Sequence, residues 1–356
     1  MRGIKNVKNS FDYGRTVVKC ELLINGAVMA TQRTDFVITW IKDNDLNWLN
    51  EKSKYLSENT AEGSYARQFR NWGLLRYWFR GVEKFAPWVH KIHFVTEGHL
   101  PDWLNTGHDK LNIVKHADFI PKRFLPTFNS NAIELFMHKI PDLAEQFVYF
   151  NDDMFLIKKM DPEDFFRDNL PCDLAVLGTV LPQDETITNI IFNNVKIINR
   201  YFRKTDLTIR QWRKVLCLCY GKLLVRSLCL YPFSRHTGFY DPHLAIPFTK
   251  STFEIVWNHI PDELSETCMH RFRSPRDFSI WLMRYWNLAA GNFVPHEMPG
   301  KYFEIGNPDL VPFIRNQKGK IVCCNDVRDG LVFETEKHRL AEAFALILPE
   351  KSRFEK

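Results

Sequence analysis

The distribution of apolar and polar residues divides the first half of the chain into short strands with helices between them. Four apolar runs rich in β-branched and aromatic residues occupy residues 35–41, 91–96, 111–115 and 147–150. Each run is too short for a helix and is bounded by polar residues, which indicates a buried strand. Helical periodicity covers residues 63–85 and 129–140, and both segments stop beside a proline. This alternation predicts an α/β fold with a mostly parallel, twisted sheet flanked by helices, of the Rossmann-like or GT-A-like kind.

The second half of the chain and its two ends carry other patterns. Helices are predicted at residues 205–230, 275–290 and 335–348, so the second half is more helical than the first. Asn25 and Gly26 stand between two short apolar runs within residues 17–29, which is a strong hairpin signal. Residues 238–247 show no regular period and are predicted to be irregular.

The composition is that of a globular protein, and it narrows the classes of function. Among 356 residues, 45% are hydrophobic and 25% are charged, which excludes disordered, collagen-like and coiled-coil chains. The net charge of +6 suits an anionic small substrate but is too weak to indicate a nucleic-acid partner. Aromatic residues make up 14% of the chain, and most fall in the predicted strands and on helical faces. We therefore expect most of them in the core and not on a glycan-binding surface.

The cysteines and the apolar runs favour a cytoplasmic protein. Eight cysteines are scattered along the chain without a C-x-x-C pair, which favours reduced thiols in a reducing compartment. Residues 1–10 are basic and polar and lack the apolar segment of a secretory signal. No run of about 18 uncharged apolar residues is present, so we expect no membrane-spanning helix.

Two polar clusters directly follow predicted strands, where ligands bind in a parallel sheet. Asn151, Asp152 and Asp153 follow the fourth strand, and Asp43 and Asp45 follow the first as a D-x-D sequence. Adjacent carboxylates are costly to hold together unless a cation or a proton neutralises them. Their oxygens suit Mg²⁺ or Mn²⁺ held together with substrate phosphates, or one carboxylate takes a proton from an attacking hydroxyl. A turn with a helix cap is the structural alternative at both places.

Three further segments contain polar residues that suit phosphate chemistry. Asn131 and Glu134 resemble a capping box at a helix start, and the free N–H groups of such a start also hold phosphate. Arg271 and Arg273 form a basic cluster before a helix, which suits a phosphate clamp or a solvated surface. His243 is one of 12 histidines, and by itself it is weak support for catalysis. No P-loop, G-x-S-x-G or Cys/His zinc motif is present.

One basic segment leaves two interpretations open. Residues 210–233 mix Leu, Trp, Tyr and Cys with five basic residues. Such a segment suits either a core helix with a basic solvent-facing side or an amphipathic helix that seeks a membrane surface. We prefer the core helix and keep a peripheral membrane contact as the alternative.

Four blocks of the sequence occur together in the order typical of one known family. They are residues 35–45, residues 75–155, the segment around His243 and residues 270–277, within a matched region of about residues 35–290. The second block is the most specific, because it joins Leu75-Arg76-Tyr77, Asn129-Ser130-Asn131 and Asn151-Asp152-Asp153 in one long stretch. The blocks resemble the Stealth family of sugar-1-phosphate transferases. Its members include bacterial capsular polysaccharide phosphotransferases and the catalytic subunit of N-acetylglucosamine-1-phosphotransferase.

The resemblance implies an activity and a division of the chain. A hexose-1-phosphate would move from a UDP-sugar to a hydroxyl of a growing or lipid-linked glycan, with UMP released. A catalytic domain at residues 35–300 would lie between an N-terminal hairpin extension, residues 1–34, and a C-terminal strand–helix extension, residues 301–356, packed on the core. The protein would act in the cytoplasm, at the inner face of the plasma membrane, without a nucleic-acid partner.

Together with the chemistry of the side chains, the resemblance supports a hypothesis for each polar cluster. Asp152 and Asp153 would hold Mg²⁺ or Mn²⁺ and orient the acceptor. His243 would be the general base, with a carboxylate as the alternative, and Arg273 would neutralise the transferring phosphoryl group. The substrate would contact seven other residues: Trp40, Asp43, Arg76, Asn129, Asn131, Asn151 and Arg271.

Two other classes of function stay open. A UDP-sugar-dependent glycosyltransferase with a D-x-D motif would break the sugar–oxygen bond and release UDP in place of UMP. A non-catalytic glycan-binding protein would bind glycan without consuming the donor, but it has no need of paired carboxylates at a strand end.

Overall fold

The computed structural model describes residues 33–42, 44–56, 71–181, 186–326 and 333–356. The predicted hairpin at residues 17–29 lies outside these ranges, as does Asp43. All of the described residues belong to one unit, residues 33–356.

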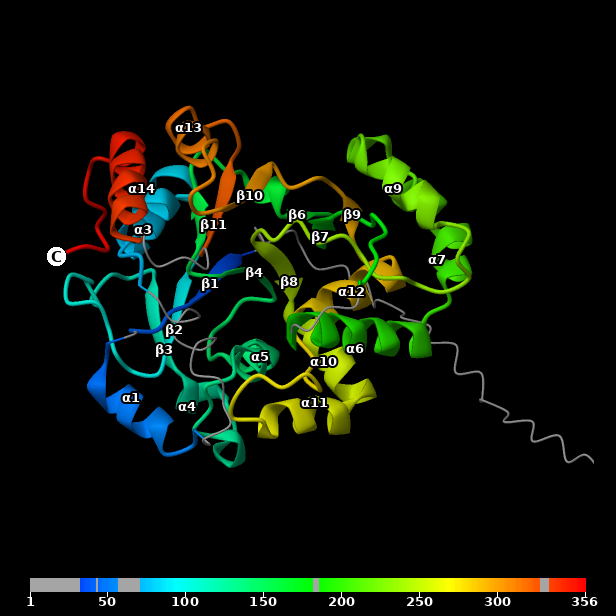
Figure 1. Ribbon diagram of the computed structural model, residues 1–356, viewed down its shortest axis with the longest axis horizontal. Helices are drawn as coiled ribbons and strands as arrows, with labels where there is room; N and C mark the ends of the chain where they lie inside the picture. Colours follow the sequence, from blue (N-terminus) through cyan, green and yellow to red (C-terminus); the bar gives the residue numbers. More distant parts are fainter. Residues whose placement is uncertain (1–32, 43, 57–70, 182–185, 327–332) are drawn as a thin grey trace, which may run out of the picture. The chain divides into compact units, whose positions relative to one another are not determined.

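A five-stranded sheet with the strand order β3-β2-β1-β4-β8 lies at the centre of the fold (Figure 1). Its strands are β1 (Thr34–Thr39), β2 (Ile92–Thr96), β3 (Leu111–Lys115), β4 (Gln146–Phe150) and β8 (Ile246–Thr249). The first four are parallel, and β8 pairs antiparallel with β4. The predicted α/β fold with a mostly parallel sheet is therefore confirmed. The segment predicted to be irregular, residues 238–247, overlaps the first two residues of β8. Its Ile-Pro-Phe-Thr sequence carries a proline, which is tolerated here because β8 is an edge strand.

Two small sheets extend this framework. One has the order β10-β11-β5 and consists of β5 (Met154–Leu156), β10 (Gly300–Glu304) and β11 (Ile321–Asn325). The other has the order β6-β7-β9 and consists of β6 (Phe166–Arg167), β7 (Leu170–Asp173) and β9 (Val294–Pro295). Because β11 pairs with β5, the C-terminal part of the chain lies directly beside the turn that follows β4.

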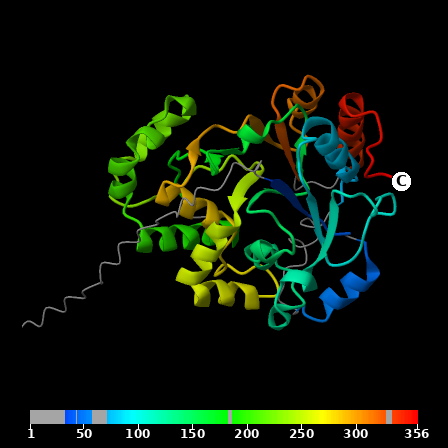
Figure 2. The ribbon, with the colours of Figure 1, turned by 180° about the vertical axis from the view of Figure 1, so that it is seen from behind.

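Helices cover both faces of the central sheet, and β1 contributes to both cores. Phe36 and Ile38 point to the first core, and Val37 points to the second. The first core packs against α3 (Leu75–Phe85), α13 (Leu310–Arg315) and α14 (Phe333–Ile347), which the front and back views show together in cyan, orange and red (Figures 1 and 2). The second core packs against α5 (Ser130–Leu135), α6 (Thr186–Tyr201), α10 (Lys250–His259), α11 (Pro261–Met269) and α12 (Trp281–Ala290).

The aromatic residues lie mainly in these two cores, as the sequence indicates. Alternate residues of β4 serve both sides, since Val148 and Phe150 belong to the first core and Phe147 and Tyr149 to the second. Phe36 contacts Phe150 with a ring-centroid distance of 4.8 Å. A central strand that is apolar on both faces is typical of a parallel sheet covered by helices on both sides.

The remaining helices are short, and one predicted helix is wrong. They are α1 (Leu46–Ser53), α4 (His116–Phe119), α7 (Lys204–Arg210), α8 (Trp212–Val215), α9 (Leu223–Leu230) and the 3₁₀ turns η1 (Lys122–Phe124), η2 (Met137–Lys139), η3 (Pro162–Asp164) and η4 (Leu218–Tyr220). The single helix predicted at residues 205–230 is divided into α7, α8, η4 and α9, because Gln211 and Gly221 leave helical geometry. Gly221 has a φ of +52°, in the left-handed region that favours glycine.

The bounds of three other predicted helices differ from the structure. Within the described residues, the helix predicted from residue 63 begins at Leu75, and the one predicted from residue 275 begins at Trp281. The helix predicted at residues 129–140 ends at Leu135 and continues as η2. Among the described helices, none combines the length and the apolar content needed to cross a bilayer.

A methyl group at Gly81 tests the contact between α3 and β5. A Cβ atom there would lie 2.8 Å from the carbonyl oxygen of Leu156, a backbone atom that cannot rotate away. We expect Gly81→Ala to lower the free energy of unfolding by about 2 kcal/mol, because the overpacking outweighs the gain in helix propensity. Urea denaturation measures the change, with Gly107→Ala in an exposed turn as the control. Wild-type stability of Gly81→Ala would contradict this packing.

Candidate active site

The carboxyl ends of β1 and β4 meet at the point where the strand order changes direction. Strand β1 has β2 on one side and β4 on the other, and ligands of open α/β sheets bind in the crevice beyond such a pair of strand ends. A cavity of about 530 Å³ lies at this place. Seven of the sequence-predicted site residues line it: Trp40, Asn131, Asn151, Asp152, Asp153, His243 and Arg273.

The turn after β4 directs two carboxylates toward the cavity. The amide of Met154 donates to the carbonyl oxygen of Asn151 at 3.2 Å, which closes the turn. Asp152 faces the cavity, but the protein around it and the charge of Asp153 raise its pKa to about 7. Burial also raises the pKa of Asp153, against the effect of the nearby His243 and a hydrogen bond from the Cys323 thiol. The turn that the sequence offered as an alternative is thus present, and it carries the carboxylate pair.

His243 approaches Asp153 from the loop before β8. Its backbone has a φ of +52°, a strained value for a residue with a side chain. Asp241 stabilises this turn, since its Oδ1 accepts a hydrogen bond from the backbone N–H of His243 at 2.9 Å. The imidazole touches the ring edges of Trp281 and Tyr302, with centroid distances of 6.0 and 5.4 Å. One ligand-type atom each of Asp153, His243 and Cys323 lies within 4.8 Å of the other two.

The donor atoms around Asp153 fit a hard divalent cation. The Cys323 thiol donates to Asp153 Oδ2 at 3.4 Å, and burial beside that carboxylate raises its pKa well above the usual value. In this arrangement the thiol acts as a hydrogen-bond donor to the carboxylate. Asp153 Oδ1 is buried, and within the described ranges nothing donates to it. This oxygen and the carboxylate of Asp152 are therefore suited to Mg²⁺ or Mn²⁺, which prefer oxygen ligands.

Arg273 and Glu134 form a second charged group in the cavity. The guanidinium of Arg273 donates to the hydroxyl of Ser130 from Nη2 at 2.7 Å and from Nε at 3.1 Å. Glu134 is buried, which raises its pKa to about 7 although Arg273 opposes the shift. The hydroxyl of Tyr149 donates to Glu134 at 3.2 Å. Arg273 therefore faces the cavity beside an acid that exchanges its proton near neutral pH.

The predicted capping box of Asn131 and Glu134 is wrong. Helix α5 begins at Ser130, and its N-cap is Asn129, whose Oδ1 accepts a hydrogen bond from the N–H of Asn131 at 3.1 Å. Glu134 is therefore too far along the helix to reach the cap, and it points to the cavity.

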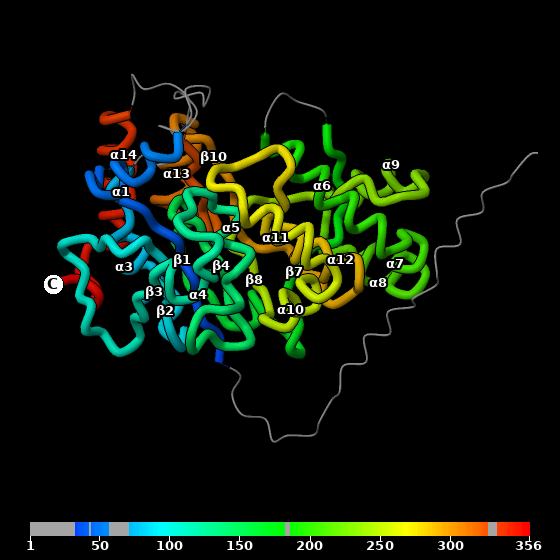
Figure 3. Tube along the Cα trace, turned by 90° about the horizontal axis from the view of Figure 1, so that it is seen from below, coloured from blue at the N-terminus to red at the C-terminus, as the bar shows by residue number. Residues whose placement is uncertain are grey.

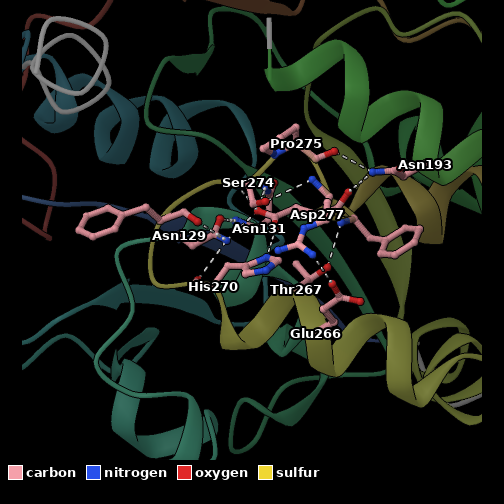
Figure 4. A network of polar contacts seen from close by, with 12 residues as sticks. Asn129, Asn131, Asn193, Glu266, Thr267, His270, Ser274, Pro275 and Asp277 are labelled. Carbon is pink, nitrogen blue, oxygen red and sulfur yellow. Dashed lines mark hydrogen bonds and ion pairs between the residues drawn. The ribbon is translucent and has the colours of Figure 1, made fainter. Parts of the chain in front are cut away.

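Asp277 connects the start of α5 with the loop that carries Arg273 (Figure 4). Its Oδ2 accepts hydrogen bonds from the side-chain amides of Asn129 at 2.8 Å and Asn131 at 3.2 Å, and from the Ser274 N–H at 2.9 Å. Its Oδ1 lies 2.6 Å from Nδ1 of His270. The carboxylate is fully buried, so these four partners replace the water that it loses. Asp277 thus holds Asn131 and the Arg273 loop in one fixed arrangement.

Three predicted substrate contacts lie elsewhere, and a fourth cannot be placed. The amide of Asn129 donates to Asp277 and to the carbonyl oxygens of residues 270 and 272. The guanidinium of Arg76 lies over the ring of Trp103 at 5.5 Å. Arg271 donates to the carbonyl oxygen of Pro126. These residues support the loops around the cavity but do not line it. Asp43 lies outside the described residues, while its neighbour Asp45 caps α1 by accepting from the N–H of Trp48 at 2.9 Å.

Sequence reasoning missed several polar residues of the cavity. They include Glu134, Tyr149, Asn325 and Asp326. Asn325 ends β11, and Asp326 follows it, in the same way that Asn151 and Asp152 follow β4. This repeated Asn-Asp pair after an apolar run was the available signal. Glu134 and Tyr149 gave none, because their proximity depends on the packing of α5 against β4.

The described geometry defines a class of protein. Paired carboxylates, an imidazole and a guanidinium face one cavity at the switch point of an α/β sheet, an arrangement typical of enzymes that bind phosphate-containing substrates. The chain belongs to the Stealth family. The family model of Stealth protein conserved region 2 matches residues 68–172, and that of conserved region 3 matches residues 242–290. The resemblance inferred from the four sequence blocks is therefore confirmed.

The chain is similar to several polysaccharide phosphotransferases over nearly the whole length of each of them. The capsular polysaccharide phosphotransferase WcwK of Streptococcus pneumoniae is 41% identical over 330 residues, 91% of this chain and 98% of the relative. The exopolysaccharide phosphotransferase cps2G of Lactiplantibacillus plantarum is 41% identical over 326 residues, 90% of this chain and 96% of the relative. The receptor polysaccharide phosphotransferase WefC of Streptococcus gordonii is 36% identical over 332 residues, 91% of this chain and 99% of the relative.

The raised pKa of Glu134 predicts a pH-dependent stability. An unfolded Glu loses its proton near its usual pKa of 4.5, but folded Glu134 keeps it until about pH 7. Stability therefore falls as the pH rises through this window, by up to about 3 kcal/mol. In Glu134→Gln this loss is absent, so the variant gains stability relative to the wild type between pH 5 and pH 8. Urea denaturation at pH 5 and pH 8 measures this gain, and the exposed Glu254→Gln is the control. The same difference in unfolding free energy between Glu134→Gln and the wild type at both pH values would contradict the raised pKa of Glu134.

Asp277→Asn tests the network around the Arg273 loop. Replacing a buried carboxylate that accepts four hydrogen bonds leaves donors unpaired, so we expect the free energy of unfolding to fall by about 3 kcal/mol. We also expect turnover of the folded variant to fall, because Arg273 and Asn131 lose their common support. Activity is measured at a temperature where circular dichroism shows the variant folded, beside the exposed Asp262→Asn on α11. Wild-type turnover of folded Asp277→Asn would show that the network does not position Arg273.

Proposed function

We propose that this protein is a polysaccharide phosphotransferase of the Stealth family. It moves hexose-1-phosphate from a UDP-sugar to a glycan hydroxyl, forms a phosphodiester and releases UMP. The proposal is supported by relatives named as capsular, exopolysaccharide and receptor polysaccharide phosphotransferases, each matched over nearly its full length. The observation that carries it is the joint presence of Asp152, Asp153, His243 and Arg273 around one cavity.

The cavity suits a nucleotide sugar with a pyrophosphate. Its volume of about 530 Å³ is within the usual range for small-molecule sites. Arg273 lines the cavity and provides positive charge for phosphate oxygens, and Asn131 lines it with an amide that donates one hydrogen bond to Asp277. Trp40 also lines the cavity, packed on Phe94 with a ring-centroid distance of 5.7 Å, and its indole borders the nucleotide in this proposal.

The chemistry requires one new bond and the loss of one existing bond. The oxygen of the acceptor hydroxyl attacks the β-phosphorus of the donor, and the bond between this phosphorus and the oxygen that bridges the two phosphates breaks. UMP departs with that oxygen, while the sugar keeps its own bond to the β-phosphoryl group. Positioning and neutralisation of charge are the main contributions to such a transfer. Arg273 provides the neutralisation from this chain.

His243 takes the proton of the attacking hydroxyl in this proposal. The imidazole reaches the cavity beside Asp153, with one ligand-type atom of each within 4.8 Å of the other, and imidazoles commonly act as general bases. Asp153 or Asp152 as the base is the alternative within the same site. Mg²⁺ or Mn²⁺ bound by these two carboxylates would neutralise charge on the donor phosphates.

The partners and the location follow from the same proposal. The donor is a UDP-sugar, and the acceptor is a growing or lipid-linked glycan. The reaction takes place in the cytoplasm at the inner face of the plasma membrane. These statements rest on the sequence and on the chemistry of the cavity.

Identification of the released nucleotide tests the proposed function. The purified protein is incubated with a panel of UDP-sugars and short glycan acceptors, with Mg²⁺ or Mn²⁺ and with a chelator. We expect acceptor-dependent UMP and a phosphodiester product, both abolished by the chelator. UDP as the product would show a glycosyltransferase, and glycan binding without donor consumption would show a binding protein.

Substitution of Arg273 tests its role in this reaction. Removal of a group that stabilises transition-state charge lowers turnover by about 10²–10³-fold, so we expect this loss in Arg273→Ala. Arg276→Ala is the matched control, because Arg276 lies on the same loop and is exposed but does not line the cavity. The rate of UMP release measures both variants. A turnover of Arg273→Ala equal to that of the control would remove Arg273 from the mechanism.

A further inference from the structure

The net positive charge of the chain comes from one segment. Residues 203–235 contain eight lysine or arginine residues and a single acidic residue, Asp206. The other residues of the chain hold 40 basic and 41 acidic side chains, which nearly cancel. Residues 203–235 form α7, α8, η4 and α9, and we refer to them as the 203–235 lobe. The helices of the lobe lie beyond α12, away from the central sheet, in both the front view and the view from below (Figures 1 and 3).

The lobe also exposes large apolar side chains. Helix α9 has the sequence Leu-Leu-Val-Arg-Ser-Leu-Cys-Leu, yet its only buried residue is Ser227. Val225 and Leu228 are 62% and 52% exposed. Four more exposed apolar residues belong to the lobe: Ile209, Trp212, Leu218 and Phe233. The segment is therefore not the single core helix that we preferred. Leu207 and Val215 do belong to a core, but six large apolar side chains of the lobe are exposed, and such exposure is typical of an interaction surface.

The exposure is a built feature, because the buried side of the lobe is firmly held. The ammonium group of Lys204 donates to the carbonyl oxygens of Leu230 and Phe233, both at 2.8 Å, and so joins the start of α7 to the end of α9. Lys214 donates in the same way to the carbonyl oxygens of Gly291 and Phe293, at 2.7 and 2.8 Å.

The hydroxyl groups of the lobe attach it to the segment that follows β7. The Ser227 hydroxyl accepts from the N–H of Leu177 at 2.9 Å, and the Tyr220 hydroxyl accepts from the N–H of Ala175 at 3.2 Å. Polar side chains thus help to hold the inner side of the lobe, together with the buried Leu207 and Val215, while six other large apolar side chains remain exposed. Six of its eight basic residues are exposed together with them: Arg203, Arg210, Arg213, Lys222, Arg226 and Arg235.

We propose that the 203–235 lobe is a docking surface for a membrane that contains anionic lipids. The partner must be negatively charged and must also accept Trp, Leu and Phe side chains, and an anionic lipid surface meets both needs. A second copy of the chain would bring the same positive charge, which disfavours self-association through this surface. The inference rests on the membrane location in the proposed function and names the surface that provides it. Because binding is measured without donor or acceptor, its failure is distinct from a failure of the transfer reaction.

The lobe is connected to the candidate active site. The guanidinium of Arg226 lies over the ring of Tyr240 at 5.4 Å. Tyr240 precedes His243 by three residues, and its carbonyl oxygen accepts from Arg284 at 3.0 Å. The membrane-binding lobe would therefore be joined by direct contacts to the segment that carries His243.

Vesicle flotation tests the proposal with the full chain. Vesicles of phosphatidylcholine alone are compared with vesicles that contain phosphatidylglycerol, at low and high salt. We expect binding only to the anionic vesicles, and a decrease of this binding at high salt. Equal binding to both vesicle types, or no binding to anionic vesicles at low salt, would overturn the proposal.

Paired substitutions locate the contact. Each exposed basic residue removed lowers membrane affinity by about fivefold, so Arg213→Gln with Lys222→Gln should lower it more than tenfold. The charge-matched control is Lys158→Gln with Lys351→Gln, outside the lobe. Val225→Ser with Leu228→Ser removes apolar contact, and exposed Leu346→Ser on α14 is its control. Equal vesicle binding by the lobe variants and the control variants would contradict the proposal. A wild-type dimer that is lost only in the lobe variants would also contradict it, because the lobe would then bind a second copy of the chain.

Discussion

The structure depends on holding two neighbouring carboxylates at the end of a strand that is buried on both faces. Asp152 and Asp153 follow β4, the strand whose residues serve the cores on both sides of the sheet. Charge is costly in such surroundings, which is why the pKa values of both carboxyl groups are raised. Two groups from distant parts of the chain, His243 before β8 and the Cys323 thiol on β11, partly offset the raised pKa of Asp153.

A third carboxylate, that of Asp277, is stabilised in a different way. Asp277 is a fully buried carboxylate, and it is stabilised by four hydrogen-bond partners from the start of α5 and the loop before α12. Because these partners include Asn131 and the neighbour of Arg273, the same contacts that satisfy the charge also position the polar groups of the cavity. Asp277 is thus saturated by the protein itself, whereas Asp153 Oδ1 accepts no hydrogen bond from the described residues.

Much of this arrangement could be predicted from local sequence, and the rest depends on tertiary contacts. The composition and length of the apolar runs predicted strands β1 to β4. The position of the two carboxylates directly after a strand predicted their role in the site. Arg76, Asn129 and Arg271 were placed in the site by motif, but Trp103, Asp277 and Pro126 are their actual partners. Glu134 was missed because it reaches the cavity only through its contact with Tyr149 on β4, whereas the Asn-Asp pair at residues 325 and 326 did carry a signal in the sequence. The basic segment was misread because burial of Ser227 instead of Leu228 follows from hydrogen bonds and not from hydropathy.

The central claim is that the groups around Asp153 direct attack at phosphorus and not at the anomeric carbon. A donor labelled with ¹⁸O in the oxygen between the anomeric carbon and the β-phosphorus separates the two directly. The account predicts that mass spectrometry finds the label in the phosphodiester product and that the released nucleotide is unlabelled UMP. Label in a released UDP would contradict it, because the sugar–oxygen bond would then be the one that breaks.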